Sequence, residues 1–401
     1  MGEAGVRVRP ALRRTVRETG VERWHFEVWN EPNLPNSWKG ALEEYCRLYD
    51  YTVAAATRAL PTVKVGGPAT SGPATESARE FLAGFLDHCP SGTNAVTGQT
   101  GTRLDFISFH TKGAHYSRRR VYKLHAPVER ESPSSGGMVR DIQAGLETVA
   151  RHRELRSLPI FLDECDPAAG TIHGVYDNPN FIVTNTEYYP NFLRALVKRV
   201  LGLNRWFDDR IALITTWAFY FEGKRFFEGN RTLVTNENIE KPILNGFRML
   251  SRLEHMRLRT TSTCSRDAIG VASPASEVDA LAAASGDKIT VLLWHQADEW
   301  WAEGKANVEV CLERLPFERK ALVRHYRIDG EHSNAYSEWV RQGKPQDPSP
   351  AQIERIKSRQ GLEMLEPPRT HDVRADGTLV LTFSLPLFGT SLLEVEPSRT
   401  P

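Results

Sequence analysis

The sequence has few cysteines and no pair of them at metal-ligand or redox spacing. Its 401 residues include five cysteines, and none of these forms a Cys-x-x-Cys motif. An odd and scattered set argues against a disulfide framework and against a zinc site. We therefore interpret all five as reduced, structural thiols.

Neither charge sign is in excess, and long apolar runs are absent. The chain has 51 Lys and Arg against 50 Asp and Glu, with a net charge of +1. Because no basic stripe or polybasic tail stands out, we expect no nucleic-acid partner. No stretch is apolar enough to cross a bilayer, so we expect no membrane partner. The first residues, MGEAGVRVRPALRR, lack the apolar centre of a signal peptide. For the chain as given this predicts a cytoplasmic location, with the true localisation left open.

What the sequence does contain, from Glu22 to about Leu253, is an alternation of short β-rich runs with amphipathic stretches. This alternation predicts parallel strands joined by helical crossovers. The predicted strands are Trp24–Trp29, Val63–Gly67, Leu104–His110, Ile160–Asp163 and Ile211–Phe219. The predicted helices are Pro10–Thr19, Ala41–Leu60, Ser77–His88, Gly137–Arg153, Asn185–Leu203 and Pro242–Glu254. Five βα units are enough for a doubly wound sheet, whereas a (β/α)8 barrel needs about eight.

The pattern of predicted elements changes after Glu254, where predicted strands separated by Gly, Pro and Asp turns follow one another. We expect strands at Ile289–His295, Ala321–Asp329, Leu379–Ser384 and Leu392–Val395, and one helix at Pro348–Gly361 with Ser349 as its N-cap. The sequence therefore predicts two domains: an α/β domain over residues 1–254 and a β-sandwich accessory domain over 255–401.

Two acidic residues directly follow predicted strands. Glu31 follows Trp24–Trp29, and Glu164 follows Ile160–Asp163. Because the C-terminal ends of parallel strands meet at one edge of a sheet, both carboxylates are expected at the same edge. Two facing carboxylates are the usual equipment for glycosidic cleavage, in which one protonates the leaving oxygen and the other attacks the anomeric carbon. Either residue alone would more simply be a solvated strand-end acid, but their equivalent positions favour a site.

The segment Trp24–Asn33 (WHFEVWNEPN) resembles the acid/base motif of glycoside hydrolase family 39, which holds β-xylosidases and α-L-iduronidase. Val65–Ala69 resembles the next strand of that family. Three further segments resemble the iduronidase branch: His88–Asn94, Leu104–Ala114 and Asp163–Pro167. The family's C-terminal β-domain is similar to Tyr326–Asp329, His332–Tyr336 and Thr390–Glu394. The resemblance covers nearly the whole chain.

Carried over by motif, the resemblance implies Glu31 as general acid/base and Glu164 as nucleophile of a retaining mechanism. It implies a contact from Asn30 to the sugar 2-hydroxyl. The other implied substrate-binding residues are His110, Lys112, Gly170, Glu222 and Arg231. Lys112 and Arg231 would bind a uronate carboxylate, which suits an ammonium and a guanidinium group. Alternatively, Lys112 is a solvated loop residue, Arg231 pairs with a nearby Glu, and His110 only supports the strand end.

Two departures from the family pattern bear on these expectations. Thr171 stands where the iduronidase branch has a tryptophan, which leaves the identity of the sugar open. The acid/base and nucleophile motifs follow the first and fourth predicted strands, whereas in the family they follow the fourth and seventh. We therefore expect a (β/α)8 TIM-barrel type of α/β fold that is incomplete, with about five βα units corresponding to strands 4–8, as the catalytic domain over 1–254.

The leading interpretation is a retaining glycoside hydrolase that cleaves terminal α-L-iduronide-like uronic acids from oligosaccharide or glycosaminoglycan-like substrates. The alternatives are a β-xylosidase of the same family and a truncated, non-catalytic carbohydrate-binding remnant. A nucleotide-binding protein is disfavoured, because Val65–Pro68 lacks the G-x-G-x-x-G spacing and Pro68 offers no N–H to a phosphate. No metal or organic cofactor is expected, because His110, His115 and His173 show no ligand spacing.

Overall fold

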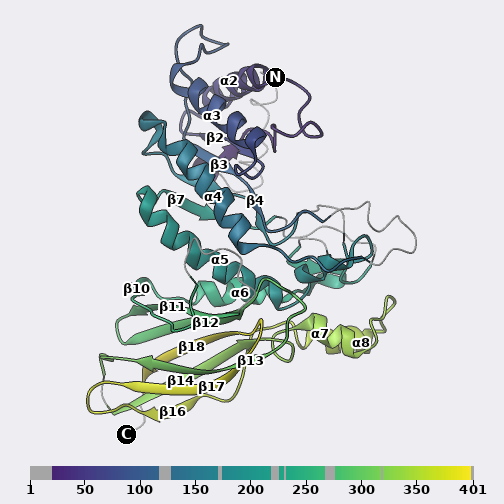
Figure 1. The fold of residues 1–401 in the computed structure, drawn as a ribbon, viewed down its shortest axis with the longest axis vertical. Coiled ribbons are helices and arrows are strands. Elements are labelled where there is room, and N and C mark those ends of the chain that lie inside the picture. Colours follow the sequence, from purple (N-terminus) through teal and green to yellow (C-terminus); the bar gives the residue numbers. More distant parts are fainter. Residues whose placement is uncertain are drawn as a thin grey trace. The chain divides into compact units, whose positions relative to one another are not determined.

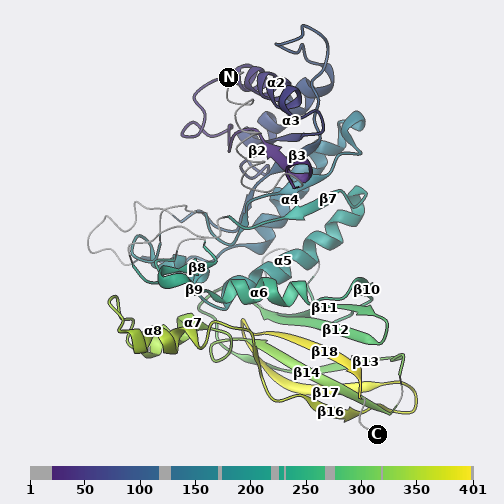
Figure 2. The ribbon, with the colours of Figure 1, turned by 180° about the vertical axis from the view of Figure 1, so that it is seen from behind.

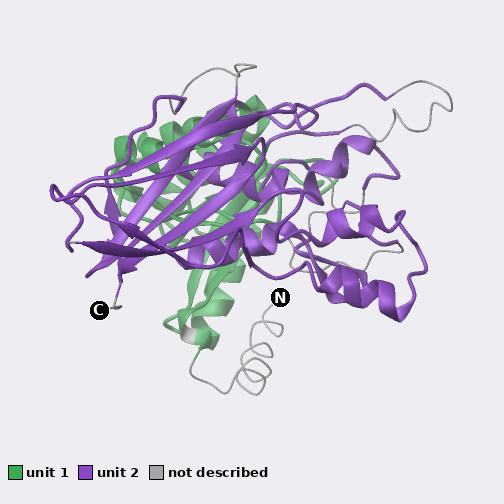
Figure 3. Cartoon of the chain, turned by 90° about the horizontal axis from the view of Figure 1, so that it is seen from below, with its two compact units in different colours: residues 1–112, 137–165, 200–217 green, residues 113–136, 166–199, 218–401 purple. Residues whose placement is uncertain are grey.

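The computed structural model describes residues 20–116, 128–169, 174–217, 225–229, 232–266, 276–317 and 319–398. The chain forms two compact units, coloured separately in Figure 3. Unit 1 comprises residues 1–112, 137–165 and 200–217, and unit 2 comprises 113–136, 166–199 and 218–401. The predicted domains 1–254 and 255–401 are based on the change in predicted secondary structure after Glu254, and they stay a prediction. The predicted helix Pro10–Thr19 lies outside the described residues.

Unit 1 contains a five-stranded parallel sheet whose strands follow the order of the chain (Figure 1). Its strands, in spatial order, are β1 (His25–Glu27), β2 (Lys64–Thr70), β3 (Phe106–Phe109), β5 (Ile160–Leu162) and β7 (Ile211–Ile214). Every neighbouring pair is parallel. A doubly wound sheet reverses its strand order at a switch point, and this sheet does not. The predicted mixed α/β class with a parallel sheet is confirmed.

The helices that follow these strands are amphipathic, as predicted. They are α2 (Leu42–Ala59), α3 (Glu76–Ser91), α4 (Ser135–Ala150), α5 (Tyr188–Asn204) and α6 (Pro242–Ser251). Helix α2 buries Tyr45, Tyr49 and Val53, which are spaced four residues apart and therefore share one face. The Tyr45 hydroxyl donates a hydrogen bond to the carbonyl oxygen of Val28 at 2.8 Å, which ties α2 to the end of β1.

Main-chain hydrogen bonds continue past the strand ends at the C-terminal edge of the sheet. The Glu31 amide donates to the Ala69 carbonyl oxygen at 2.9 Å, and the His110 amide donates to that of Thr70 at 2.8 Å. The Glu164 carbonyl oxygen accepts a hydrogen bond from the amide of Thr111 at 3.0 Å. The backbone around all three side chains is therefore fixed by the sheet rather than left as free loop.

Unit 2 is built on antiparallel strands. One sheet has the order β10 (Met256–Leu258), β11 (Glu277–Ser285), β12 (Lys288–Gln296), β18 (Thr390–Pro397), β14 (Lys320–Ile328), β15 (Glu363–Met364), with β16 (Arg369–Asp372) also on β14. A second sheet pairs β13 (Lys305–Leu312) with β17 (Leu379–Pro386). The sequence did not predict β11 and β13, because β11 is rich in alanine, which has low β-propensity, and β13 is half-exposed.

Both antiparallel sheets contribute to one hydrophobic cluster, which contains Val291, Leu293, Val323, Leu381, Leu385 and Leu393. Helices α7 (Ala335–Arg341) and α8 (Pro350–Lys357) pack together in the same unit (Figure 2). Helix α8 begins after Ser349, as predicted, and the Ser349 amide donates to Gln352 Oε1 at 2.9 Å. The remaining short strands are β4 (Thr111–Lys112), β6 (Cys165–Asp166), β8 (Val234–Thr235) and β9 (Ile239–Glu240). No helix in the described part of the chain combines the length and apolarity that a bilayer span requires.

Candidate active site

The segment after β1 turns sharply at the edge of the parallel sheet. Trp29 and Glu31 have φ angles of 71° and 47°. Residues other than glycine rarely adopt this left-handed backbone region, and each such residue costs of the order of 1–3 kcal/mol of folding free energy. These two residues flank Asn30, and their backbone angles bring the Glu31 carboxylate to the edge of the sheet beside β3. A strained backbone next to a carboxylate is a pattern typical of functional sites.

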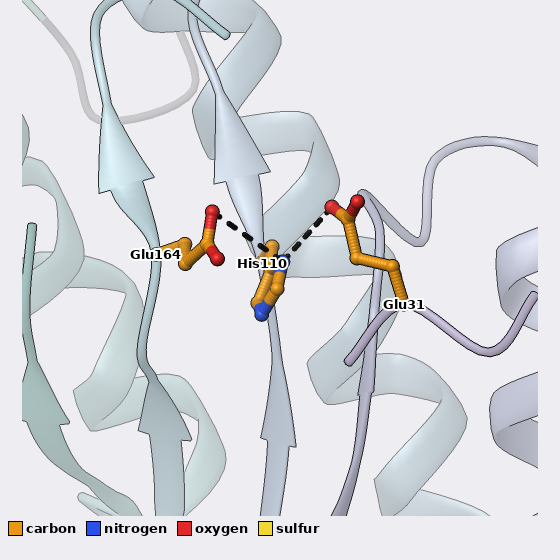
Figure 4. A group of neighbouring side chains, drawn as sticks. All are labelled: Glu31, His110 and Glu164. Atoms are coloured by element: carbon orange, nitrogen blue, oxygen red, sulfur yellow. Dashed lines mark hydrogen bonds and ion pairs between the residues drawn. The ribbon is translucent and has the colours of Figure 1, made fainter. Parts of the chain in front are cut away.

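Three side chains that follow β1, β3 and β5 meet at this edge, as Figure 4 shows. The His110 Nδ1 atom lies 2.9 Å from Glu31 Oε1 and 3.9 Å from Glu164 Oε2. One polar atom from each side chain lies within 4.8 Å of the others. The His110 side chain is 1% exposed, whereas that of Glu31 is 22% exposed. The imidazole is therefore buried between the two carboxylates, and both of these are more exposed than the imidazole.

Lys112 supplies a positive charge to one of the two carboxylates. Its Nζ atom donates to Glu164 Oε2 at 2.7 Å and to the Glu164 carbonyl oxygen at 3.2 Å. Both side chains are almost fully buried, with 5% and 10% exposed. The Lys112 ammonium group is thus a direct counter-charge to the Glu164 carboxylate. Glu31 and Glu164 thus differ in their surroundings, since a histidine contacts one and a lysine the other.

A second carboxyl pair lies on the other side of His110. The Glu27 carboxyl group neighbours that of Asp163, and the Asp163 Oδ1 atom lies 3.7 Å from His110 Nε2. Burial raises the pKa of Asp163 to about 10, and the neighbouring Glu27 carboxyl adds to the rise. The sequence analysis missed this pair. The available signal was Glu27, an acidic residue at the end of β1, between Phe26 and Val28.

The structure brings together four of the predicted site residues: Glu31, His110, Lys112 and Glu164. Asn30 is exposed beside Glu31, and its amide forms no hydrogen bond with a described residue. The other predicted site residues, Gly170, Glu222 and Arg231, lie outside the described residues, as does Thr171.

The loop after Glu31 borders a hollow of about 400 Å³, which is lined by Pro32, Asn33, Pro35, Trp38, Lys39, Gly40, Leu42 and Phe81. The rings of Trp29 and Trp38 lie edge to face, with centroids 5.2 Å apart. Trp29 is 49% exposed. An exposed indole offers a flat apolar face next to polar groups, which suits the C–H face of a sugar ring.

The spacing of Glu31, His110 and Glu164 is also one that a metal ion could accept. We assign no metal to it, because Lys112 already provides a cation to Glu164 and the two carboxylates have a sufficient explanation in acid/base and nucleophilic chemistry.

Comparison with known proteins gives one consistent match. The family model of glycosyl hydrolases family 39 matches residues 11–377. A β-xylosidase of Geobacillus stearothermophilus is 25% identical over 388 residues, which cover 94% of this chain and 67% of that protein. An α-L-iduronidase of Mus musculus is 27% identical over 414 residues, which cover 96% of this chain and 60% of that protein. The chain thus spans about two thirds or less of the length of these curated relatives.

Solved structures with the same fold include a bacterial orthologue of human α-L-iduronidase. It matches with a TM-score of 0.78 and 21% identity, over 99% of this chain and 66% of that one. A monomeric β-xylosidase from Caulobacter crescentus CB15 matches with a TM-score of 0.75 and 21% identity, over 99% of this chain and 74% of that one.

Proposed function

The chain belongs to glycosyl hydrolase family 39, and from this premise we propose that it is a retaining glycoside hydrolase with Glu31 as general acid/base and Glu164 as nucleophile. The observation that carries the proposal is the closeness of the two carboxylates, which have oxygens within 4.8 Å of each other. Retaining enzymes hold their carboxyl groups about 5–5.5 Å apart, whereas inverting enzymes leave about 6.5–9.5 Å for a water molecule.

The proposed reaction has two displacements. In the first, a Glu164 oxygen attacks the anomeric carbon while Glu31 gives its proton to the leaving oxygen, so the glycosidic bond breaks and an ester to Glu164 forms. In the second, Glu31 takes a proton from water, the water oxygen attacks the same carbon, and the ester breaks. Lys112 holds the Glu164 carboxylate in place for the attack through its 2.7 Å contact, and Asn30 hydrogen-bonds the sugar 2-hydroxyl.

We propose terminal α-L-iduronide-like uronic acids as the substrates, with Lys112 and Arg231 near the sugar carboxylate. A lysine has three donor hydrogens and is therefore able to bind Glu164 and a uronate together. The exposed face of Trp29 would meet the leaving-group sugar, because Glu31, which protonates the leaving oxygen, lies two residues from Trp29.

The second candidate is a β-xylosidase. Thr171 in place of a tryptophan and the similarity to the Geobacillus stearothermophilus β-xylosidase favour it. In either case we propose that β1, β2, β3, β5 and β7 correspond to strands 4–8 of a (β/α)8 barrel followed by a β-sandwich, which is supported by their uninterrupted spatial order and by the fold of the solved relatives.

Hydrolysis of two aryl glycosides by the purified chain tests this proposal. We expect release of the phenol from an aryl α-L-iduronide, faster than from the matching β-D-xyloside, and loss of both activities in Glu164→Ala. Faster cleavage of the xyloside would select the second candidate. A soluble, folded chain that cleaves neither glycoside would contradict the proposed activity.

A further inference from the structure

The loop after β2 is bound to the segment that carries Glu31. The Asn33 side chain holds this loop by two hydrogen bonds: its amide nitrogen donates to Ser71 Oγ at 2.8 Å, and its amide oxygen accepts from the Ser71 backbone N–H at 2.9 Å. Asn33 follows Glu31 by two residues, and the Glu31 amide itself donates to the Ala69 carbonyl oxygen at 2.9 Å. The loop after β2 and the segment of the proposed acid are therefore fixed to each other.

On its other side, the same loop is bound by a carboxylate from helix α4. Asp141 Oδ1 accepts a hydrogen bond from the Ala74 amide at 3.0 Å, and Asp141 Oδ2 accepts one from the Thr111 hydroxyl at 3.2 Å. The Thr111 amide in turn donates to the Glu164 carbonyl oxygen at 3.0 Å. One side chain thus connects the loop after β2 to a residue that is bound to the backbone of the proposed nucleophile.

The loop backbone lies directly against the Asp141 carboxylate. A Cβ atom added at Gly72 would lie 2.4 Å from Asp141 Oδ2 and 2.5 Å from Oδ1, so neither atom could keep its place beside a larger residue. Glycine is the residue that permits so close an approach of the backbone. Position 72 therefore allows the loop to reach the carboxylate that binds the Ala74 amide.

Packing alone does not explain a carboxyl group at position 141. Burial raises the pKa of Asp141 to about 6, so the ionised form carries a cost in folding free energy. An apolar side chain of similar size would fill the same space without that cost, but it would accept no hydrogen bond from Ala74 or Thr111. What the carboxylate adds is the connection between the two segments.

We propose that Asn33 and Asp141 are positioning residues that make the loop 71–74 a brace. The brace sets the separation of Glu31 and Glu164, and the inference rests on the proposed roles of these two residues. A retaining mechanism needs its carboxyl groups about 5–5.5 Å apart, and misplacing a reacting group by about 1 Å can cost roughly 100-fold in rate. Because the brace acts through the backbone, its loss should lower kcat more than it raises KM.

Steady-state kinetics of three variants on an aryl glycoside test the brace. Asp141→Ala loses both hydrogen bonds, so kcat should fall roughly 10- to 100-fold with little change in KM. Gly72→Ala pushes the carboxylate away and should have the same effect. Asp141→Asn should restore kcat, because its amide oxygen accepts from the Ala74 amide and its amide nitrogen donates to Thr111 Oγ1.

Asp105→Ala is the matched control. Asp105 also accepts a backbone hydrogen bond, from the Val65 amide at 2.9 Å, but at the opposite end of the parallel sheet. Its loss should lower the free energy of unfolding and leave kcat unchanged at temperatures well below unfolding. Equal kcat values in Asp141→Ala and the wild type would overturn the inference. So would equal losses in Asp141→Ala and Asp105→Ala, or a loss that Asp141→Asn does not reverse.

Amide hydrogen exchange of the full chain, followed by mass spectrometry, separates a failed brace from a failed hydrolysis because it needs no turnover. In Asp141→Ala the peptides that contain Glu31 and Thr111 should lose protection, and in Asp105→Ala they should keep it. Unchanged protection of the Glu31 peptide in Asp141→Ala would overturn the brace. Lost protection in a chain that cleaves no glycoside would support the brace and contradict only the proposed hydrolysis. If Asp141→Ala does not fold, Gly72→Ala decides by the same measurement.

Discussion

The two main sheets of this protein treat their charged side chains in opposite ways. On the antiparallel sheet of unit 2, acids are matched with bases: Arg327 Nη1 lies 3.3 Å from Asp329, Arg252 lies 3.1 Å from Glu394, and Arg199 lies 3.0 Å from Glu277. At the edge of the parallel sheet of unit 1, the residues that the structure describes place four carboxyl groups near His110 and Lys112: Glu27, Glu31, Asp163 and Glu164.

This difference separates structure from chemistry. In an ion pair the two opposite charges largely cancel, so the pair contributes, at best, to stability. An excess of acids costs folding free energy, but it makes at least one carboxyl hold a proton near neutral pH, which general acid catalysis requires. The left-handed φ angles of Trp29 and Glu31 add a conformational cost at the same edge. If the proposed roles of these residues hold, stability is given up for function in unit 1.

The largest expected effect is on turnover at the parallel sheet. Glu164→Ala removes the attacking oxygen, so kcat should fall by roughly 10⁴-fold or more, as for residues that act as a catalytic unit. Added azide or formate should restore part of the rate, because a small anion fits the space of the lost carboxylate. Steady-state assays with an aryl glycoside, with the exposed Glu147→Ala as control, measure both effects. Loss without rescue would argue for a structural role.

The next largest effect is on the stability of the antiparallel sheet. Asp329→Ala leaves the Arg327 guanidinium, which is 2% exposed, without its carboxylate. Breaking a buried pair from one side typically costs about 3–5 kcal/mol. Urea denaturation should show this loss, whereas Glu366→Ala, which breaks the exposed pair with Arg369, should cost about 1 kcal/mol or less. Equal costs would mean that the buried pair adds no more to stability than the exposed one.

In unit 1, the substitution Asp163→Asn should change how the free energy of unfolding depends on pH. Folded Asp163 keeps its proton up to about pH 10, whereas the carboxyl of the unfolded chain loses it near its ordinary pKa of 3.8. Between these values the folded state binds more protons, so wild-type stability should fall as pH rises, by at most about 1.4 kcal/mol per pH unit. Asp163→Asn lacks this slope.

Denaturation at pH 5, 6.5 and 8 measures the difference between wild type and Asp163→Asn. The exposed Asp209→Asn serves as a matched control and should retain the wild-type slope. Parallel curves for wild type and Asp163→Asn would mean that Asp163 ionises normally in the folded protein.

A smaller effect concerns substrate selection by Lys112. If its ammonium binds a uronate as well as Glu164, Lys112→Met should lower kcat/KM for the iduronide more than for the xyloside. A charge-assisted hydrogen bond is worth about 1.5–3 kcal/mol, so the ratio of the two values should change about 10- to 100-fold. Lys39→Met, on the exposed loop after Glu31, is the control. Equal losses on both sugars would restrict Lys112 to supporting Glu164.

The sequence predicted the elements that carry a strong periodicity, and its motifs predicted which side chains meet at the edge of the parallel sheet. Strand β5 and helix α2 were found because buried parallel strands and amphipathic helices have clear patterns. The meeting of Glu31 with Glu164 followed from their equivalent places at strand ends. The contact between Glu27 and Asp163 was not predictable in the same way, because it depends on which faces of two strands, separated in the sheet by β2 and β3, point to each other.

The most direct test of the central claim is to trap the covalent intermediate. A 2-deoxy-2-fluoro glycoside with a good leaving group slows the second displacement more than it slows the first, so the ester accumulates. Our account predicts a mass increase of one fluorosugar on the peptide that contains Glu164, and none in Glu164→Gln. A label on a different carboxylate, or turnover with inversion and no label, would contradict it.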